Sequence, residues 1–517
     1  MKELKIPPRA YQENIFETCK KENCLVVLPT GTGKTLISLM LAIDRFKQFP
    51  LEKILILAPT RPLVEQHFNS FKKNIPEDWA DMQIFTGKTP AEKRKKIWQT
   101  AEWVFSTPQC ISNDLKKNLY TLENVSLLIF DECHRCLKNY AYNFIAQKYK
   151  QHTQNSRVLG LTASPGADKK TISKVCENLG IQSVEIRTRD SEDIKPYLQE
   201  LEFEKIEVDF PPEFEEIRQL LKEIYDKKVG ELKSRKVLFG YASKKTLLDC
   251  QRKIFRALSS GTKSINMFVS ASVCAQAIKI QHAMELLETQ TISSFIDYLK
   301  KIYTESEEKK SKAAQKLAGD LRFNKAYTLA LTINFEHPKL KKLTEIIKNQ
   351  IKESPNAKII VFAQYRDTVN KIKKDLEKIP GIKPVIFVGQ TIKKHYDGKT
   401  TGLKQKEQQE VIKDFSIGKF NILIATSIGE EGLDIPEVSE VIFYEPVPSA
   451  IRSIQRRGRT ARLAPGSLKI LITKNTRDES YHYASQAKEK SMHKAIDEIK
   501  NEMGNLNNSD EKQERLF

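Results

Sequence analysis

Two closely spaced glycines, a lysine and a threonine follow a short apolar run near the start of the chain. Glycines allow backbone N–H groups to converge on one anion, and a lysine beside them can reach the outer phosphates of a nucleotide. A threonine hydroxyl at the next position can bind Mg²⁺. The sequence therefore predicts a phosphate-binding loop made of Pro29, Thr30, Gly31, Thr32, Gly33, Lys34 and Thr35.

An acidic pair, Asp131 and Glu132, directly follows the apolar run 126–130. Carboxylates at the end of a buried strand can hold Mg²⁺ and can orient and deprotonate an attacking water molecule. We assign the Mg²⁺ contact to Asp131, together with Thr35, and the activation of water to Glu132. With Lys34, this pair predicts ATP and Mg²⁺ as cofactors and ATP hydrolysis as the reaction.

Short apolar runs alternate with helical patterns around these residues. In the first part of the chain the runs are residues 24–28, 53–58, 103–106, 126–130 and 157–161. The same alternation returns after residue 340, with runs at residues 358–363, 384–388, 421–426, 440–444 and 468–473. Apolar runs of this kind are typical of strands buried on both faces of a parallel sheet. We therefore predict an α/β protein with two parallel-sheet domains.

Helical periodicity with few strand signals fills the stretch between the two α/β parts. Phe214, Ile217, Leu221 and Ile224 recur at helical spacing, and Lys-rich helical patterns follow them. We predict a helical insertion there and, at the C-terminus, a disordered charged tail. The predicted domains are residues 1–205, the ATP-binding domain; 206–336, the helical insertion; 337–500, the second α/β domain; and 501–517, the tail.

The charge of the chain favours a polyanionic partner. It has 517 residues, with 86 Lys+Arg against 66 Asp+Glu and a formal net charge of +20. An excess of this kind points first to nucleic acid. No apolar run is long enough to cross a bilayer, so we expect no membrane partner. The eight cysteines show no disulfide framework and the N-terminus has no secretory signal, which favours a cytoplasmic location.

The sequence Asp131-Glu-Cys-His134, together with the phosphate-binding loop, resembles the superfamily 2 helicases of the DExH/D kind. The resemblance implies two RecA-like domains with ATP in the cleft between them. It also implies adenine recognition by Arg9 and Gln12. Other motifs of the first half imply nucleic-acid contacts by Thr60, Arg61, Gly87, Ser106 and Thr107. The motif that contains Thr162 and Ser164 implies coupling between the ATP site and the second domain.

Motifs of the second half also match this family in the expected order. The resemblance implies nucleic-acid contacts by Gln364 and Thr426. Gly432 and Asp434 are expected to face the nucleotide. From the sequence 455–462, Gln455 is expected near the γ-phosphate, with Arg459 and Arg462 as arginine fingers. Ala461 stands where the family usually has glycine.

Within the family, the insertion and the motif sequences look like those of archaeal Hef and its relative, the Fanconi anaemia group M translocase. This implies an ATP-dependent DNA helicase or translocase acting on forked or branched DNA in replication-fork repair and recombination. The insertion, similar to a polymerase thumb, is expected to grip duplex near the branch. No nuclease motif is found in this sequence, so a nuclease acting in trans is a candidate partner. The residues 513–517 loosely resemble a clamp-binding peptide, which makes a sliding clamp another.

Two alternatives stay open. Helicases of the RNA-sensor and Dicer type share the insertion site and similar motifs, and they bind double-stranded RNA through its 2′-hydroxyl groups. A protein of a different class, an ATP-gated scaffold on branched DNA, would use hydrolysis only for release. The nucleic acid that stimulates hydrolysis best, and the effect of Glu132→Gln on strand separation, distinguish the three hypotheses.

Overall fold

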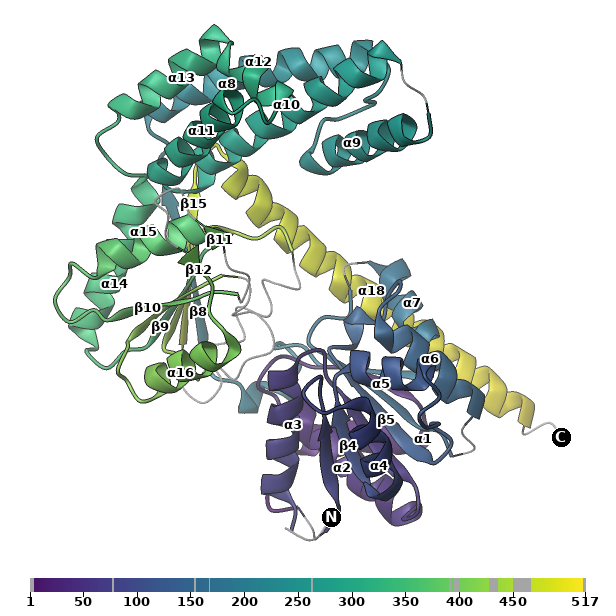
Figure 1. Cartoon of the computed structure of the whole chain (residues 1–517). Coiled ribbons are helices and arrows are strands. Elements are labelled where there is room, and N and C mark those ends of the chain that lie inside the picture. The colour runs from purple at the N-terminus through teal and green to yellow at the C-terminus, as the bar shows by residue number, and fades with distance from the viewer. Residues whose placement is uncertain are drawn as a thin grey trace.

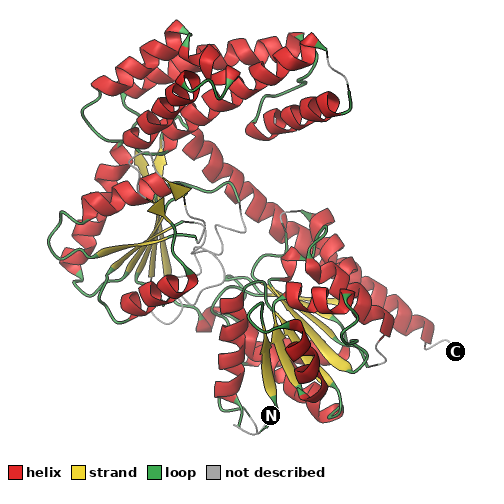
Figure 2. Cartoon of the chain, viewed as in Figure 1, coloured by secondary structure: helices red, strands yellow, loops and turns green. Residues whose placement is uncertain are grey.

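Two parallel sheets and a helical bundle make up the chain in a computed structural model (Figures 1 and 2). The structure describes residues 4–76, 79–152, 155–166, 168–261, 264–389, 393–394, 400–426, 436–449 and 466–514. This architecture confirms the predicted fold class. The first sheet lies near the N-terminus of the chain, most strands of the second follow the bundle in sequence, and one long C-terminal helix runs between them (Figure 1).

The first sheet has seven strands in the order β3-β4-β2-β5-β6-β1-β7, and every recorded pairing in it is parallel. The strands are β1 (Cys24–Val27), β2 (Lys53–Leu57), β3 (Met82–Phe85), β4 (Trp103–Ser106), β5 (Val125–Asp131), β6 (Val158–Thr162) and β7 (Ser183–Ile186). The helices of this lobe are α1 (Ala10–Lys21), α2 (Lys34–Gln48), α3 (Arg61–Asn74), α4 (Ala91–Thr100), α5 (Pro108–Lys116), α6 (Ala141–His152) and α7 (Lys169–Leu179).

Helices cover both faces of this sheet, which explains its continuous apolar strands. Along β5, Leu128 and Phe130 belong to one hydrophobic cluster, and Leu127 and Ile129 belong to another. Alternate residues of a strand point to opposite faces, so each face has its own core. All seven residues of β5 are buried. The carboxyl end of this strand is therefore held firmly from both sides, and it carries Asp131.

The second sheet has six strands in the order β10-β13-β9-β14-β15-β8, again with parallel pairings. They are β8 (Leu201–Val208), β9 (Ile359–Phe362), β10 (Pro384–Phe387), β13 (Ile422–Ala425), β14 (Glu440–Phe443) and β15 (Gly466–Thr473). The described helices beside them are α14 (Pro338–Glu353), α15 (Arg366–Leu376) and α16 (Gln405–Ser416). A short antiparallel pair, β11 (Lys393–Lys394) with β12 (Thr400–Thr401), completes the lobe.

Strand β8 differs from the sequence analysis, which predicts no strand there and ends the first domain at residue 205. It pairs with β15 along its whole length, from Leu201 beside Gly466 to Val208 beside Thr473. The chain thus enters the second sheet before the insertion begins. Like β3 and β7, which are also absent from the predicted strands, β8 lies at a sheet edge. These three edge strands are partly exposed and lack the continuous apolar run that identifies a central strand.

The insertion is a bundle of six helices among the described residues. They are α8 (Pro212–Ser234), α9 (Lys244–Ser259), α10 (Ile265–Thr289), α11 (Ile292–Glu307), α12 (Lys312–Ala318) and α13 (Leu321–Thr332). Phe214, Ile217, Leu221 and Ile224 of α8 are all buried in its core, as their spacing predicts. A second, smaller cluster joins α9 to α8 and α10.

Buried polar contacts attach the insertion to the second lobe. Lys339 of α14 donates from its Nζ to Thr289 O at the end of α10 and to Asp478 Oδ2, both at 2.7 Å, and neither charged side chain is exposed. Thr368 of α15 donates to Gln290 Oε1 at 2.7 Å. Buried ions that lose their partners are costly, so these contacts favour one orientation of the insertion.

The last helix, α18 (Arg477–Glu514), returns to the first lobe (Figure 1). Met492, Ala495, Ile496 and Ile499 are buried in a core cluster of that lobe. Their helical spacing produces an apolar stripe that α7 and β7 cover. The helix runs to Glu514, where the sequence analysis predicts a disordered tail from residue 501. Gly504 and the nearby asparagines have low helix propensity, which explains that expectation.

Candidate active site and nucleic-acid face

The predicted phosphate-binding loop lies between β1 and the first turn of α2. Gly31 and Gly33 have φ of 83° and 81°, backbone angles that favour glycine. The loop is braced by Thr32, whose hydroxyl donates to Pro29 O at 2.7 Å. Lys34 Nζ donates to Leu28 O at 2.9 Å and to Pro29 O at 3.2 Å. The ammonium group therefore lies over the loop, where phosphate oxygens can replace the two carbonyl acceptors.

Gln12 and Arg9 lie beside this loop, at the start of α1. Gln12 accepts from Arg9 N at 2.8 Å and donates to Thr32 O at 3.2 Å, and the Tyr11 hydroxyl donates to the same carbonyl at 2.6 Å. A pocket of about 180 Å³ opens here. It is lined by Ile6, Pro7, Arg9, Gln12, Gly31, Thr32, Gly33 and Leu36. An amide beside an apolar pocket can pair with a purine edge, which supports the adenine assignment.

Asp131 is buried at the end of β5 and contacts an unexpected partner. His67 of α3 places Nε2 2.8 Å from Asp131 Oδ2, and its ring is also buried. Burial alone would raise the pKa of Asp131, but His67 and Lys34 outweigh it and lower the pKa below its ordinary value. The carboxyl group is therefore ionised at neutral pH. An ionised carboxylate at this strand end has the chemistry that Mg²⁺ requires, and Thr35 follows Lys34 in the loop.

Glu132 begins a short polar chain that ends at the predicted coupling residues. It has φ 49° and ψ 47°, a left-handed conformation that is uncommon outside glycine. His134 Nδ1 lies 3.3 Å from Glu132 Oε2 and 3.2 Å from Thr162 Oγ1. Ser164 N donates to Thr162 Oγ1 at 3.0 Å. His134 therefore lies between Glu132 and the pair Thr162 and Ser164, both fully buried at the end of β6.

The strand order divides the edge of the first sheet into two neighbouring regions. β5, β6 and β1 carry Asp131, Thr162 and the phosphate-binding loop, while β2, β4 and β3 precede the residues predicted to bind nucleic acid. Because all pairings are parallel, the carboxyl ends of the six strands lie at the same edge of the sheet. α3 begins directly after β2 and contains His67. The contact from His67 to Asp131 therefore crosses the boundary between the two regions.

The residues predicted to bind nucleic acid differ in exposure. Thr60 precedes the first turn of α3, and Arg61 donates to Glu65 Oε1 at 2.7 Å. Gly87 is exposed, and an added methyl group would meet nothing within 4 Å. Ser106 is fully buried, and its hydroxyl lies 3.1 Å from Phe85 O and 3.0 Å from Thr107 O. The Ser106 side chain therefore supports the turn and has no surface to offer a phosphate group.

The second lobe presents two of its predicted residues within the described part of the chain. Gln364 is exposed after β9, and its N–H donates to Glu445 Oε1. Thr426 follows the neighbouring strand β13, with its N–H donating to Phe387 O at 3.2 Å. The remaining assignments of this lobe lie outside the described residues: Gly432, Asp434, Gln455, Arg459 and Arg462.

Two contacts of this site were not predicted from the sequence, those of His67 and His134. His67 was missed because it occupies a position on the buried stripe of α3, with Val64 and Phe71 on either side. The one signal in the sequence was a polar residue within an otherwise apolar stripe, which indicates a buried polar contact. His134 belongs to the sequence Asp131-Glu-Cys-His134, but nothing in its local sequence indicates Thr162 as its partner.

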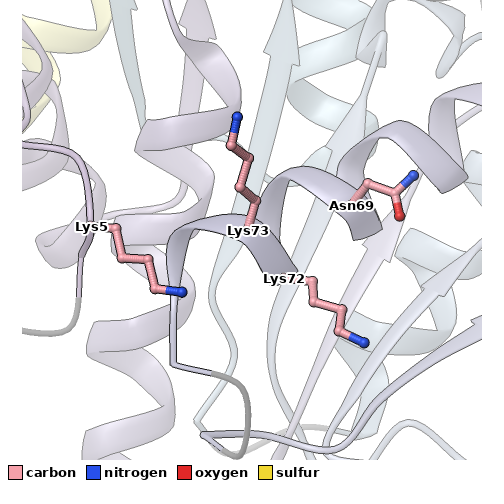
Figure 3. Close-up of a pocket in the computed structure, with 4 residues that line it drawn as sticks. All are labelled: Lys5, Asn69, Lys72 and Lys73. Carbon is pink, nitrogen blue, oxygen red and sulfur yellow. The ribbon is translucent and has the colours of Figure 1, made fainter.

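A basic pocket lies at the far end of α3 (Figure 3). It has a volume of about 610 Å³ and is lined by Lys5, Asn69, Lys72 and Lys73. The 14 residues of α3 extend about 21 Å, so this pocket is well separated from Thr60 and Arg61. Its charge suits anions, but it lies outside the ATP site.

None of the helices in the described part of the chain is long and apolar enough to span a membrane. Within the same part, no group of three or more His, Cys, Asp or Glu residues could hold a metal ion by itself. A Mg²⁺ site built from Asp131 and Thr35 would therefore need oxygens from the nucleotide or from water, which is how proteins usually bind this ion.

Comparison with known families gives three matches in chain order. The DEAD/DEAH box helicase model matches residues 9–172. A helical bundle described as that of a putative ATP-dependent RNA helicase matches residues 213–337, and the helicase conserved C-terminal domain matches residues 338–464. The three matches correspond to the first lobe, the insertion and the second lobe.

Individual relatives agree with this division. The crystal structure of the Pyrococcus furiosus Hef helicase domain is 44% identical, with a TM-score of 0.70, over 92% of this chain and 98% of that one. A putative ATP-dependent RNA helicase of Methanocaldococcus jannaschii is 39% identical over 94% of this chain but only 60% of its own length. The Fanconi anemia group M protein homolog of Mus musculus is 32% identical over 95% of this chain and 26% of its own length. The chain thus spans less than two thirds of these curated relatives, and it belongs to the DEAD/DEAH box helicases, in the group that contains the Hef helicase domain.

Proposed function

We propose that this chain is an ATP-dependent DNA helicase or translocase that acts on forked or branched DNA in replication-fork repair and recombination. The observation that carries the proposal is the division of one sheet edge into an ATP region and a nucleic-acid region. His67 connects the two by its 2.8 Å contact with Asp131. A protein that couples hydrolysis to movement on DNA requires such a connection.

The first lobe supplies most of the proposed chemistry. Lys34 exchanges the carbonyl oxygens of Leu28 and Pro29 for phosphate oxygens, and Asp131 and Thr35 would hold Mg²⁺. When bound, Mg²⁺ would offset negative charge on the phosphates. Glu132 takes a proton from the attacking water. His134 Nδ1, 3.3 Å from Glu132 Oε2, keeps the carboxylate of Glu132 oriented.

The second lobe supplies the charge that completes this site in the proposal. Arg459 and Arg462 stabilise negative charge on the transferred phosphate, and Gln455 approaches it, while Gly432 and Asp434 face the nucleotide. Closure around ATP and opening after hydrolysis would shift the two lobes along DNA held by both. The buried contacts of Lys339 support the insertion moving together with the second lobe.

The printed names of the relatives divide between DNA and RNA. A Neurospora crassa relative, 34% identical over 92% of this chain, is an ATP-dependent DNA helicase, whereas the Methanocaldococcus jannaschii relative is described as a putative RNA helicase. Double-stranded RNA therefore stays the second candidate substrate, and an ATP-gated scaffold on branched DNA the third. Relatives from Pyricularia oryzae and Candida albicans are also described as ATP-dependent DNA helicases, which favours DNA.

A substrate panel tests the proposal directly. ATP hydrolysis is measured with forked DNA, a four-way junction, duplex DNA, single-stranded DNA and duplex RNA at one salt concentration, because phosphate contacts make binding salt-dependent. We expect the fork or the junction to stimulate hydrolysis most. Stronger stimulation by duplex RNA would reject DNA as the substrate.

Two substitutions test the mechanism. Glu132→Gln removes the base, so hydrolysis should fall at least about 100-fold and strand separation should stop while ATP still binds. Strand separation without hydrolysis would favour the scaffold. Arg459→Ala should lower the rate of hydrolysis about 1,000-fold with little change in ATP affinity. An unchanged rate would exclude Arg459 as an arginine finger.

Partners and location belong to the same proposal. The eight cysteines are all buried and free, which supports a reducing, cytoplasmic compartment. We propose a nuclease and a sliding clamp as candidate protein partners. Deleting the peptide 513–517 should abolish capture by a purified sliding clamp, and unchanged capture would remove this peptide from the proposal.

A further inference from the structure

The tip of the insertion carries large apolar side chains that are exposed to solvent. In the loop between α8 and α9, Phe239 is 74% exposed and Tyr241 is 85% exposed. On α9 itself, Leu248 is 40% exposed and Phe255 is 52% exposed. Aromatic side chains gain a large free energy from burial, so their gathering on one exposed surface indicates a partner that covers them.

The backbone beneath these side chains is held in place. Leu238, which precedes Phe239, is buried in the cluster that joins α9 to α8 and α10. The Tyr225 hydroxyl donates to Ala242 O at 2.8 Å, and Cys250 Sγ lies 3.2 Å from Val237 O. Ser243 then caps the first turn of α9. The exposed rings are thus presented by a fixed loop and a regular helix.

Basic and apolar residues alternate along one face of α9. Lys245, Leu248, Arg252 and Phe255 follow one another at intervals of three and four, which places them on one side of α9, and Tyr241 lies in the loop just before the helix. We call these five residues the α9 stripe. Lys253 and Arg256 lie next to it. Lys245, Lys253 and Arg256 have no ion-pair partner among the residues that the structure describes, whereas Arg252 pairs with Asp249.

This combination matches the chemistry of unpaired nucleotides. Bases stack on aromatic rings whatever their identity, while lysine and arginine contact the phosphates. A protein partner of similar apolar character would not require the unpaired cations. A closed duplex would offer its phosphates but no base faces. The charge and the rings together therefore favour a single strand.

We propose that the α9 stripe binds the unpaired bases of a single-stranded DNA segment at a fork or branch. The inference rests on the proposed function and adds the part of the substrate that the tip of the insertion contacts. α9 has 16 residues and is about 24 Å long. At about 3.4 Å per stacked nucleotide, it accommodates about seven nucleotides.

The test uses the full chain and two fluorescent probes, an oligothymidine of twelve nucleotides and a blunt duplex of the same length. Tyr241→Ala and Phe255→Ala should each weaken binding to the single strand about 5- to 150-fold, the range measured for loss of one base–aromatic stack. Binding to the duplex should change less than about twofold. Tyr241→Phe keeps the ring and should bind the single strand like the parent.

Leu321→Ala and Tyr483→Ala are matched controls, because these side chains are also exposed, at 84% and 56%, but lie on α13 and α18. They should leave the affinity for both probes unchanged. Circular dichroism checks that each variant is folded. Photocrosslinking of an oligonucleotide that contains 5-bromodeoxyuridine should label the peptide 235–259 in the parent and not in Tyr241→Ala.

The outcomes are distinguishable from failure of the proposed function. If forked DNA stimulates ATP hydrolysis by the parent but the stripe variants keep the parent's affinity for the single strand, this inference is wrong and the function stands. Equal losses for single strand and duplex would also overturn it, because they would indicate contacts with phosphates alone. If no DNA stimulates hydrolysis by the parent, the proposed function itself fails.

Discussion

Gly33 is the position where a single methyl group should damage nucleotide binding most selectively. Its φ is +81°, and an added Cβ would lie 2.3 Å from Gln12 Nε2. Gly381 provides a matched control, because its φ is +82° and an added Cβ would meet nothing within 4 Å. Both Gly→Ala substitutions therefore carry the same backbone strain, of about 1–2 kcal/mol. Only Gly33→Ala also displaces a side chain.

The displaced side chain sets the expected size of the effect. The added Cβ would meet the Nε2 end of Gln12, so the amide must leave its contact with Thr32 O, which is worth about 1 kcal/mol. It then no longer lines the pocket beside the loop. A loss of about 1 kcal/mol corresponds to an increase of about fivefold in the Kd for ATP. Gly381→Ala should keep the Kd of the parent and lose only stability.

Titration with a fluorescent ATP analogue measures these affinities. The decisive measurement is a double-mutant cycle with Gln12→Ala, which removes the clashing amide. In that background Gly33→Ala should add little further loss of affinity. If Gly33→Ala costs as much with Ala at position 12 as it does in the parent, the clash with Gln12 is not the cause and the reasoning is refuted.

Three further predictions concern buried polar contacts. Lys339→Met leaves Asp478 buried without its cation and should lower the free energy of unfolding by about 3–5 kcal/mol, measured by urea denaturation. The double variant Lys339→Met, Asp478→Asn should recover much of this loss. Equal stability of the single and double variants would contradict this. Burial opposes ionisation of Glu285, but hydrogen bonds from His282 and Lys244 dominate and lower its pKa to about 2 from 4.5. A carboxylate whose pKa is lower in the folded than in the unfolded state stabilises the fold at pH values above its unfolded pKa. The difference in free energy of unfolding between the parent and Glu285→Gln should therefore shrink by about 2 kcal/mol between pH 6 and pH 3. A constant difference would refute the assignment. His67→Ala should raise the Mg²⁺ concentration needed for half-maximal ATP hydrolysis about 10- to 100-fold. Binding of the nucleotide without Mg²⁺ should stay unchanged. A parallel loss of Mg²⁺-free binding would show a general folding defect instead.

The strands of the two sheet centres could be predicted from sequence because each is buried on both faces. β5 is apolar from Leu127 to Phe130 and ends at Asp131, so its sequence identifies both the strand and the acidic pair. The edge strands β3, β7 and β8 carry no such signal. β8 exposes most of its first residues, and its place beside β15 follows only from the pairing of Leu201–Val208 with a segment more than 250 positions later. The domain boundary at residue 205 was misplaced for this reason.

The sequence alone was enough to predict the fold class, which the structure confirms, and to propose a phosphate-binding loop and an acidic pair, because each depends on a few consecutive residues and on the rule that parallel strands share one carboxyl edge. Tertiary structure decided which distant segments meet there. His67 reaches Asp131 across 64 positions, and α18 inserts Ile496 and Ile499 into the core of the first lobe. Neither contact has a local signal, because periodicity shows that a side chain is buried without showing what it is buried against.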